Sequence, residues 1–106
     1  MVIEELINRD KQTFYQLCNE HGVKNLFAFG SAVSNNFDTK NSDIDLLVDI
    51  DEADPLIKGE QLLSLWDKLE AFFKRKVDLL ANPVIRNPYL RQSIEESKVL
   101  IYDASR

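Results

Sequence analysis

Hydrophobic residues recur along the chain with two periods, and each period predicts one kind of secondary structure. Apolar residues three or four positions apart predict helices over residues 2–21, over residues 55–73 and from residue 88 onward. Apolar runs, either unbroken or alternating with polar residues, predict strands over residues 23–29, 42–50, 77–81 and 99–102. A short helical turn is expected over residues 30–35. The predicted order is therefore α-β-(α)-β-α-β-α-β.

Capping residues set the expected helix ends. Asp54 precedes Pro55, and Asn87 precedes Pro88. An acid or amide directly before proline is typical of a helix start, because its side chain accepts a bond from a free N–H group of the first turn. Gly22 is expected to end the first helix, since glycine readily adopts the left-handed conformation found there.

Two further features concern the start of the middle helix and the buried face of the last helix. Gly59 weakens the middle helix near its start, so the first residue could instead be Lys58 or Glu60. In the last helix, Leu90 and Ile94 are predicted to face the core.

The element order predicts an α/β (α+β) fold with a small sheet flanked by helices. The connection between the first two strands is short, so a mixed rather than purely parallel sheet is expected. A chain of 106 residues is long enough for one core, and residues 1–106 are expected to form one domain.

Charge and composition exclude several classes of function. The net charge of −5 argues against direct binding to a nucleic-acid backbone, which needs clustered Lys and Arg. Cys18 is the only cysteine, so an internal disulfide and a cysteine-based zinc site are excluded, and a core position is expected. The apolar runs are all shorter than the roughly 20 residues of a membrane span. Glu4 and Glu5 precede any apolar run, so no signal peptide is expected and the predicted location is cytoplasmic.

The second predicted strand carries two acids. Side chains alternate along a strand, so Asp43 and Asp45 are expected to project from the same face. Two neighbouring carboxylates repel each other, and such a pair is typical of a site that binds a cation such as Mg²⁺. Gly30 and Ser31 follow the first strand, where backbone N–H groups at a helical turn can bind phosphate.

Each half of this pattern also has a simpler interpretation. A Gly-Ser pair alone is a turn, and Asp-x-Asp alone is common at solvated strand ends. When both motifs occur on consecutive strands, the combination indicates a functional site more specifically than either motif alone. Asp78 adds a third acid in a short apolar strand, where a carboxylate is costly unless it is compensated.

The spacing Gly30-Ser31-x11-Asp43-x-Asp45 resembles the signature of the nucleotidyltransferase superfamily that includes DNA polymerase β. The short chain and the segment Lys76-Val77-Asp78-Leu79-Leu80 resemble the minimal nucleotidyltransferase (MNT) family, many of whose members are antitoxins paired with HEPN-domain ribonuclease toxins. The resemblance covers residues 23–102.

This resemblance implies a reaction and a role for each residue. Asp43, Asp45 and Asp78 would be the catalytic residues and would hold two Mg²⁺ ions, with Asp78 also helping to deprotonate the attacking hydroxyl. Gly30 and Ser31, together with Ser42, would bind the nucleotide. AMP would pass from ATP to a tyrosine hydroxyl of a HEPN toxin and so silence the toxin.

The sequence departs from the family pattern at one position, and two alternative functions remain open. Many family members carry an Arg shortly after the Gly-Ser pair, whereas the next cation here is Lys40, with Arg86 and Arg91 as further candidates for the triphosphate. The chain could instead neutralise its partner by binding alone, with weak catalysis. A third hypothesis is transfer to a small molecule, as in the enzymes that modify aminoglycosides.

The partner is expected to be a separate chain. The HEPN ribonuclease signature, an Arg followed a few residues later by His-x-Tyr, is absent from the sequence. His21, the only histidine, is followed by Gly22 and Val23, and its place at a helix end favours a capping or surface role.

Overall fold

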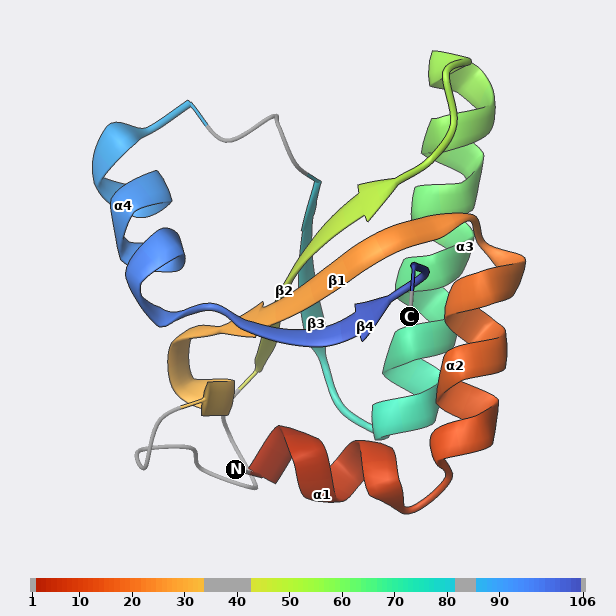
Figure 1. The fold of residues 1–106 in the computed structure, drawn as a ribbon, viewed down its shortest axis with the longest axis horizontal. Coiled ribbons are helices and arrows are strands. Elements are labelled where there is room, and N and C mark those ends of the chain that lie inside the picture. Colours follow the sequence, from red (N-terminus) through yellow and green to blue (C-terminus); the bar gives the residue numbers. More distant parts are fainter. Residues whose placement is uncertain (1, 34–42, 82–85, 106) are drawn as a thin grey trace.

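A computed structural model describes residues 2–33, 43–81 and 86–105 of the chain. The helices are α1 (Val2–Asn8), α2 (Lys11–Glu20), α3 (Pro55–Phe73) and α4 (Pro88–Ser97), with a short 3-10 helix, η1 (Gly30–Val33). The strands are β1 (Val23–Phe29), β2 (Ile44–Ile50), β3 (Val77–Ala81) and β4 (Val99–Asp103). They form a sheet in the order β3-β2-β1-β4 (Figure 1).

The sheet is mixed, as the sequence predicts. β1 pairs antiparallel with both β2 and β4, whereas β2 pairs parallel with β3 through the crossover helix α3. β1 and β2 pair antiparallel across the connection that begins with η1, whereas the 19-residue α3 is long enough to return the chain to the same end of the sheet for parallel pairing. The α/β class with a small mixed sheet is confirmed.

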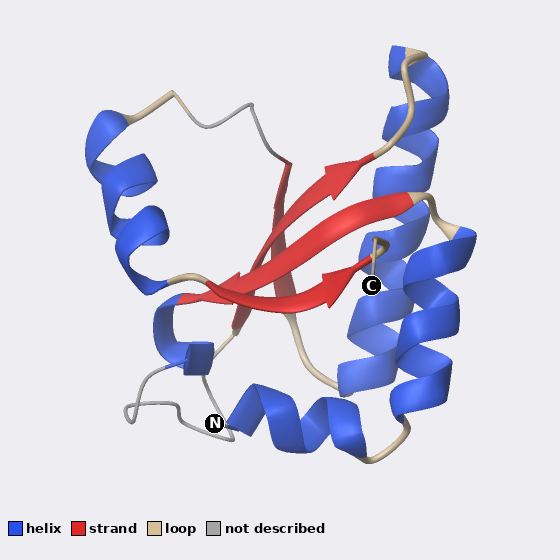
Figure 2. Cartoon of the chain, viewed as in Figure 1, coloured by secondary structure: helices blue, strands red, loops and turns tan. Residues whose placement is uncertain are grey.

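Different helices cover the two faces of the sheet (Figure 2). On one face, alternate strand residues such as Leu26, Leu46 and Leu79 pack with α1, α2 and α3 in the main core. On the other face, Phe29 and Leu47 pack with Ile94 of α4. Successive strand side chains point to opposite faces, and the apolar residues on both faces of β2 therefore follow from its position inside the sheet.

The prediction of one helix over residues 2–21 is wrong, because the helix is broken at Arg9 and Asp10. The Asp10 carboxylate accepts a bond from the Thr13 N–H at 3.3 Å and another from the Thr13 hydroxyl at 2.7 Å. A short acidic side chain that bonds to the backbone just ahead of it starts a new helix rather than continuing the old one. The apolar periodicity continues across the break, so the pattern of apolar residues does not reveal it.

The caps of α3 and α4 lie where the sequence predicts them. The Asp54 side chain accepts a bond from Leu56 N–H at 2.9 Å, and α3 begins at Pro55. Gly59 therefore does not delay the start of this helix. Asn87 caps α4 through bonds from the N–H groups of the second and third helical residues.

One of the two inward positions predicted in α4 is wrong. Ile94 is buried, but Leu90 is 42% exposed. Among the described residues, Ile94 is the part of α4 that joins the buried cluster on this face, so the second half of the helix carries the packing.

His21 and Gly22 end α2 as expected. The two imidazole nitrogens of His21 lie 2.7 Å from the Leu17 carbonyl oxygen and 2.9 Å from the Ser64 hydroxyl, so this side chain links the end of α2 to α3. Gly22 has φ +66°, the left-handed conformation that follows many helix ends. Among the described residues, the helices are too short or too polar to span a bilayer.

Cys18 lies in the core, and we expect it to be unreactive in the native protein. Burial raises the pKa of its thiol to about 12, so the thiolate that attacks thiol reagents is scarce at neutral pH. Because the folded pKa lies above the unfolded value, the contribution of this thiol to stability is complete below about pH 8.5 and is lost as the pH rises through the folded value. A chromogenic disulfide reagent should react at pH 8 only after unfolding; rapid reaction in native buffer would contradict this placement.

Candidate active site

Strand register brings the predicted acids to one end of the sheet, next to η1 (Figure 1). Asp45 is the direct partner of Asp78 across the parallel β2–β3 pair. Asp45 is also the partner of Phe29 across the antiparallel β1–β2 pair, and this places Gly30 beside it. Asp43 precedes β2 by one residue and is exposed. Residues from three strands are thus assembled at one point.

Gly30 is held against Asp45 in a way that only glycine allows. Its φ is +67°, a conformation that side chains rarely adopt. A Cβ atom built on Gly30 would stand 2.6 Å from Oδ2 of Asp45, closer than real Cβ contacts occur. Since no side chain intervenes, the backbone of the turn lies directly against the carboxylate. Half-buried Ser31 follows within η1.

The electrostatic environment of Asp45 is unfavourable to its charge. Burial raises the pKa of the Asp45 carboxyl above its ordinary value, and the negative charges of Asp78 and then Asp43 raise it further. Mutual repulsion of this kind is expected when acids share a site without a compensating cation. Three carboxylates that repel one another are a donor set suited to a hard divalent cation.

The positions of these side chains match a metal site less well than their charges do. Among the residues that the structure describes, no three His, Cys, Asp or Glu side chains already converge in metal-coordinating positions. Asp43 and Asp78 are exposed, so their carboxylates can turn toward half-buried Asp45 without disturbing the core. The site therefore fits a metal in charge and chemistry, with two of its acids free to adjust.

Replacing Asp45 with Asn should stabilise the metal-free protein at neutral pH. Because the folded pKa of Asp45 is raised, its contribution to stability is complete below the unfolded value, near pH 3.9, and is lost as the pH rises through the folded value. The neutral amide keeps the shape of the acid without its repulsion. Thermal melts in EDTA should place the variant above the wild type at pH 7, with the difference shrinking toward pH 3. A lower melting temperature for the variant at pH 7 would contradict this reading.

Two side chains of α3 fix the start of β3 and hence the backbone that carries Asp78. The indole N–H of Trp66 donates to the Val77 carbonyl oxygen at 2.6 Å. Oε2 of Glu70 accepts from the Val77 N–H at 2.9 Å. Both backbone polar groups of Val77, the residue before Asp78, are thereby held by the crossover helix.

The sequence pattern assigns Trp66 to the core and does not identify Glu70. A glutamate near the end of an amphipathic helix is normally a solvated residue, so the pattern contains no signal for this contact. Its role depends on the α3–β3 turn, which brings Glu70 back onto Val77.

Two of the other predicted residues, Arg86 and Arg91, are described by the structure, and neither is assembled with the three acids. Ser42 and Lys40 lie outside the described residues. Arg86 and Arg91 flank the start of α4 and are exposed, at the end of the helix farthest from η1 (Figure 1).

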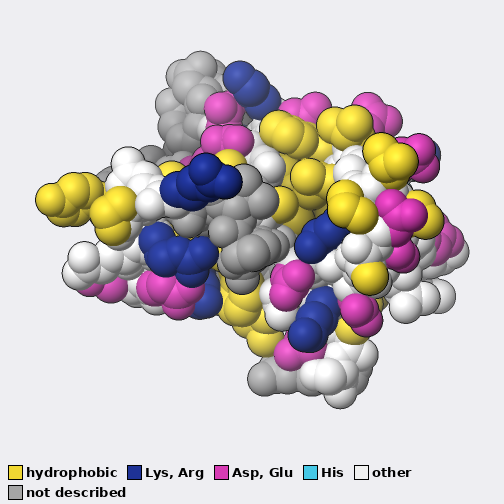
Figure 3. Space-filling model, turned by 90° about the horizontal axis from the view of Figure 1, so that it is seen from above, with side chains coloured by type: hydrophobic (Ala, Val, Ile, Leu, Met, Phe, Trp, Pro, Cys, Tyr) yellow, Lys and Arg dark blue, Asp and Glu magenta, His cyan; other side chains and the backbone are white. Residues whose placement is uncertain are grey.

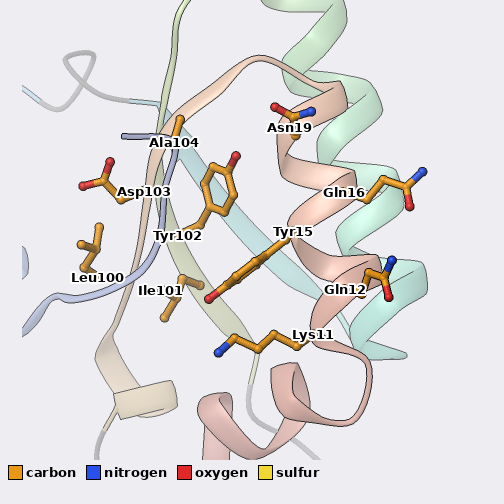
Figure 4. Close-up of a pocket in the computed structure, with 10 residues that line it drawn as sticks. All are labelled: Lys11, Gln12, Tyr15, Gln16, Asn19, Leu100, Ile101, Tyr102, Asp103 and Ala104. Atoms are coloured by element: carbon orange, nitrogen blue, oxygen red, sulfur yellow. The ribbon is translucent and has the colours of Figure 1, made fainter. Parts of the chain in front are cut away.

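A separate groove lies between α2 and the edge strand β4 (Figure 4). Its volume is about 960 Å³, and the rings of Tyr15 and Tyr102 meet edge to face within it, with centroids 5.7 Å apart. β4 and β3 are opposite edges of the sheet, and the groove contains none of the predicted site residues.

The fold places the predicted acids and the glycine turn at one end of the sheet, and comparison with known proteins gives the family. The family model described as polymerase beta, nucleotidyltransferase matches residues 12–106, so the chain belongs to this family and is a nucleotidyltransferase. A candidate protein adenylyltransferase of Methanocaldococcus jannaschii is 36% identical over 99 residues, covering 93% of this chain and 94% of the relative.

Solved structures share the fold. A toxin–antitoxin structure with AMP-PNP matches with a TM-score of 0.66 and 20% identity, over 90% of this chain and 74% of that chain. A tri-AMPylated Shewanella oneidensis HEPN toxin in complex with an MNT antitoxin gives a TM-score of 0.54 and 17% identity, over 92% and 73% of the two chains. At these identities the likeness establishes the fold alone.

Proposed function

We propose that this chain is a Mg²⁺-dependent antitoxin that transfers AMP from ATP to a tyrosine hydroxyl of a partner HEPN ribonuclease. The observation that carries the proposal is the register of β2 against β3. It sets Asp45 beside Asp78 while the Gly30 turn lies against the Asp45 carboxylate. A nucleotidyl transfer needs acids and a phosphate-binding turn at one point, and this end of the sheet supplies both.

Each residue then has a task in the reaction. Gly30 and Ser31, with Ser42, bind the triphosphate through backbone N–H groups and hydroxyls. Asp43, Asp45 and Asp78 would hold Mg²⁺, which offsets the phosphate charge and lowers the pKa of the attacking hydroxyl. Asp78 accepts the hydroxyl proton. The tyrosine oxygen attacks the α-phosphorus, the bond from that phosphorus to the bridging oxygen breaks, and pyrophosphate leaves.

A protein acceptor is supported by the relatives of the chain. Two hollows among the described residues lie beside α1, α2 and β4, and none of the three aspartates lines either of them. The Methanocaldococcus relative bears the name of a protein adenylyltransferase, and the HEPN toxin in the Shewanella complex is AMPylated.

The proposal is tested by incubating the chain with Mg²⁺, ATP labelled at the α-phosphate and a purified HEPN ribonuclease from the same operon. The expected result is label on a tyrosine of the ribonuclease, loss of its RNase activity and no reaction in EDTA. Label appearing instead on added aminoglycoside would favour a small-molecule acceptor.

Two observations favour the alternative of neutralisation by binding alone. The acids do not yet converge in metal-coordinating positions within the described residues, and the expected cation after Gly30-Ser31 is absent from the sequence. Loss of RNase activity without any incorporated label would support that alternative.

A further inference from the structure

The first half of α3 exposes large aliphatic side chains that the fold does not use. Leu56, Ile57 and Leu63 are 80%, 44% and 68% exposed, and we call these three residues the α3 patch. Hydrophobic side chains gather over this part of the molecule in Figure 3, on the right of the view. Single exposed leucines are common, but several on two turns of one helix are typical of a surface that binds another protein.

The spacing of the α3 patch suits a helical partner. Leu56 and Leu63 are seven residues apart and therefore lie on the same side of the helix, two turns from each other. Gly59 lies between them on an adjoining part of the surface. A Cβ atom added there would meet nothing within 4 Å, so packing within this chain does not require glycine at this position. A bare backbone beside two leucines lets a second helix approach closely.

The charge around the α3 patch selects the kind of partner. Carboxylates of Asp54, Glu60 and Asp67 stand before, between and after the leucines along the chain, and acidic side chains, with fewer basic ones, lie beside the hydrophobic ones in Figure 3. Outside its cap, the helix carries two cations, exposed Lys68 and half-buried Lys58. A second copy of this acidic chain would be repelled, whereas a helix with Lys or Arg beside an apolar stripe would be attracted.

We propose that the α3 patch is the docking site for a basic amphipathic helix of the partner protein. The inference rests on the proposed function, because it names how the acceptor protein is held. Asp45 is the second residue of β2, and the α3 patch follows the last, so docking and transfer are separated by about 17 Å of strand. Docking far from the acids leaves their end of the sheet open for the acceptor tyrosine.

The test uses two synthetic helical peptides of about 18 residues, each with a leucine stripe, flanked by lysines in one and by glutamates in the other. Binding to the full chain is measured by fluorescence anisotropy. The lysine peptide should bind at least roughly tenfold more tightly than the glutamate peptide, and added salt should weaken its binding. Equal binding of both peptides, or binding of neither, would overturn the proposal.

Variants locate the binding surface. Leu56→Ser with Leu63→Ser should weaken lysine-peptide binding by roughly tenfold or more, and Glu60→Lys should weaken it too. Tyr89→Ser with Leu90→Ser, which removes exposed apolar side chains from α4, is the matched control and should bind normally. Undiminished binding by the α3 double variant, with an unchanged melting temperature, would refute the assignment.

These measurements distinguish a loss of docking from a loss of catalysis. Asp78→Asn should bind the lysine peptide like the wild type while losing nucleotidyl transfer. Peptide binding that depends on Asp78 would place the docking surface at the acids and overturn the proposal. Absence of transfer in the wild type, with peptide binding intact, would count against the proposed function and leave docking in place.

Discussion

Replacing Asp78 with Asn is expected to lower nucleotidyl transfer by about 10²- to 10⁴-fold, the range for a group that moves a proton in the rate-limiting step. The amide has the same size but neither accepts the hydroxyl proton nor offers an anionic metal ligand. The side chain is exposed, and the hydrogen bonds of Trp66 and Glu70 with the backbone of Val77 remain, so the fold should be unchanged. Transfer of α-labelled AMP measures the first effect, and a thermal melt measures the second.

The same variant gives a second readout that a purely structural role would not produce. The charge of Asp78 is one of the causes that raise the pKa of Asp45, so its removal should lower that pKa. An NMR titration of the Asp45 carboxyl in the metal-free protein would detect the change. Asp51→Asn, an exposed acid beyond the far end of β2, is the matched control and should alter neither rate nor pKa. Transfer at the wild-type rate in Asp78→Asn would remove this residue from the mechanism.

Gly30→Ala is expected to impair both stability and transfer. A side chain at φ +67° costs about 1–2 kcal/mol in backbone conformation alone. In addition, the new methyl group would stand 2.6 Å from Oδ2 of Asp45, so either the turn or the carboxylate must move. Displacement of either component separates the phosphate-binding turn from the acid, and we expect transfer to fall further than stability. Denaturant unfolding and the α-label assay measure the two effects.

Gly59→Ala is the matched control for that experiment. The added methyl group would meet nothing within 4 Å, and the backbone is helical. Alanine in a helix interior is more stable than glycine by roughly 0.5–1 kcal/mol, so this variant should be slightly more stable than the wild type. If Gly30→Ala were stabilised like Gly59→Ala, the close contact between the turn and Asp45 would carry no structural weight.

Most element boundaries could be predicted because they depend on neighbours in the sequence. The start of α3 follows from Asp54 and Pro55, and the start of α4 from Asn87 and Pro88, since a cap bonds to N–H groups only two or three residues ahead. The same local character explains why β1 and β3 match their predicted ranges. The break between α1 and α2 was not predicted, because the Asp10–Thr13 bonds compete with a continuous helix that the apolar periodicity favours equally well.

The sequence by itself determined the list of acids and the glycine turn, and its alternation predicts Asp43 and Asp45 on one face, although β2 begins only at Ile44. These follow from residue type and from the strand period of two. Only the tertiary structure decided that Asp78 pairs with Asp45, that Gly30 lies against the same carboxylate, and that Leu90 is exposed. Each of these depends on which strands become neighbours and in what register. That choice is made by the packing of the whole core, and no local pattern of residues contains it.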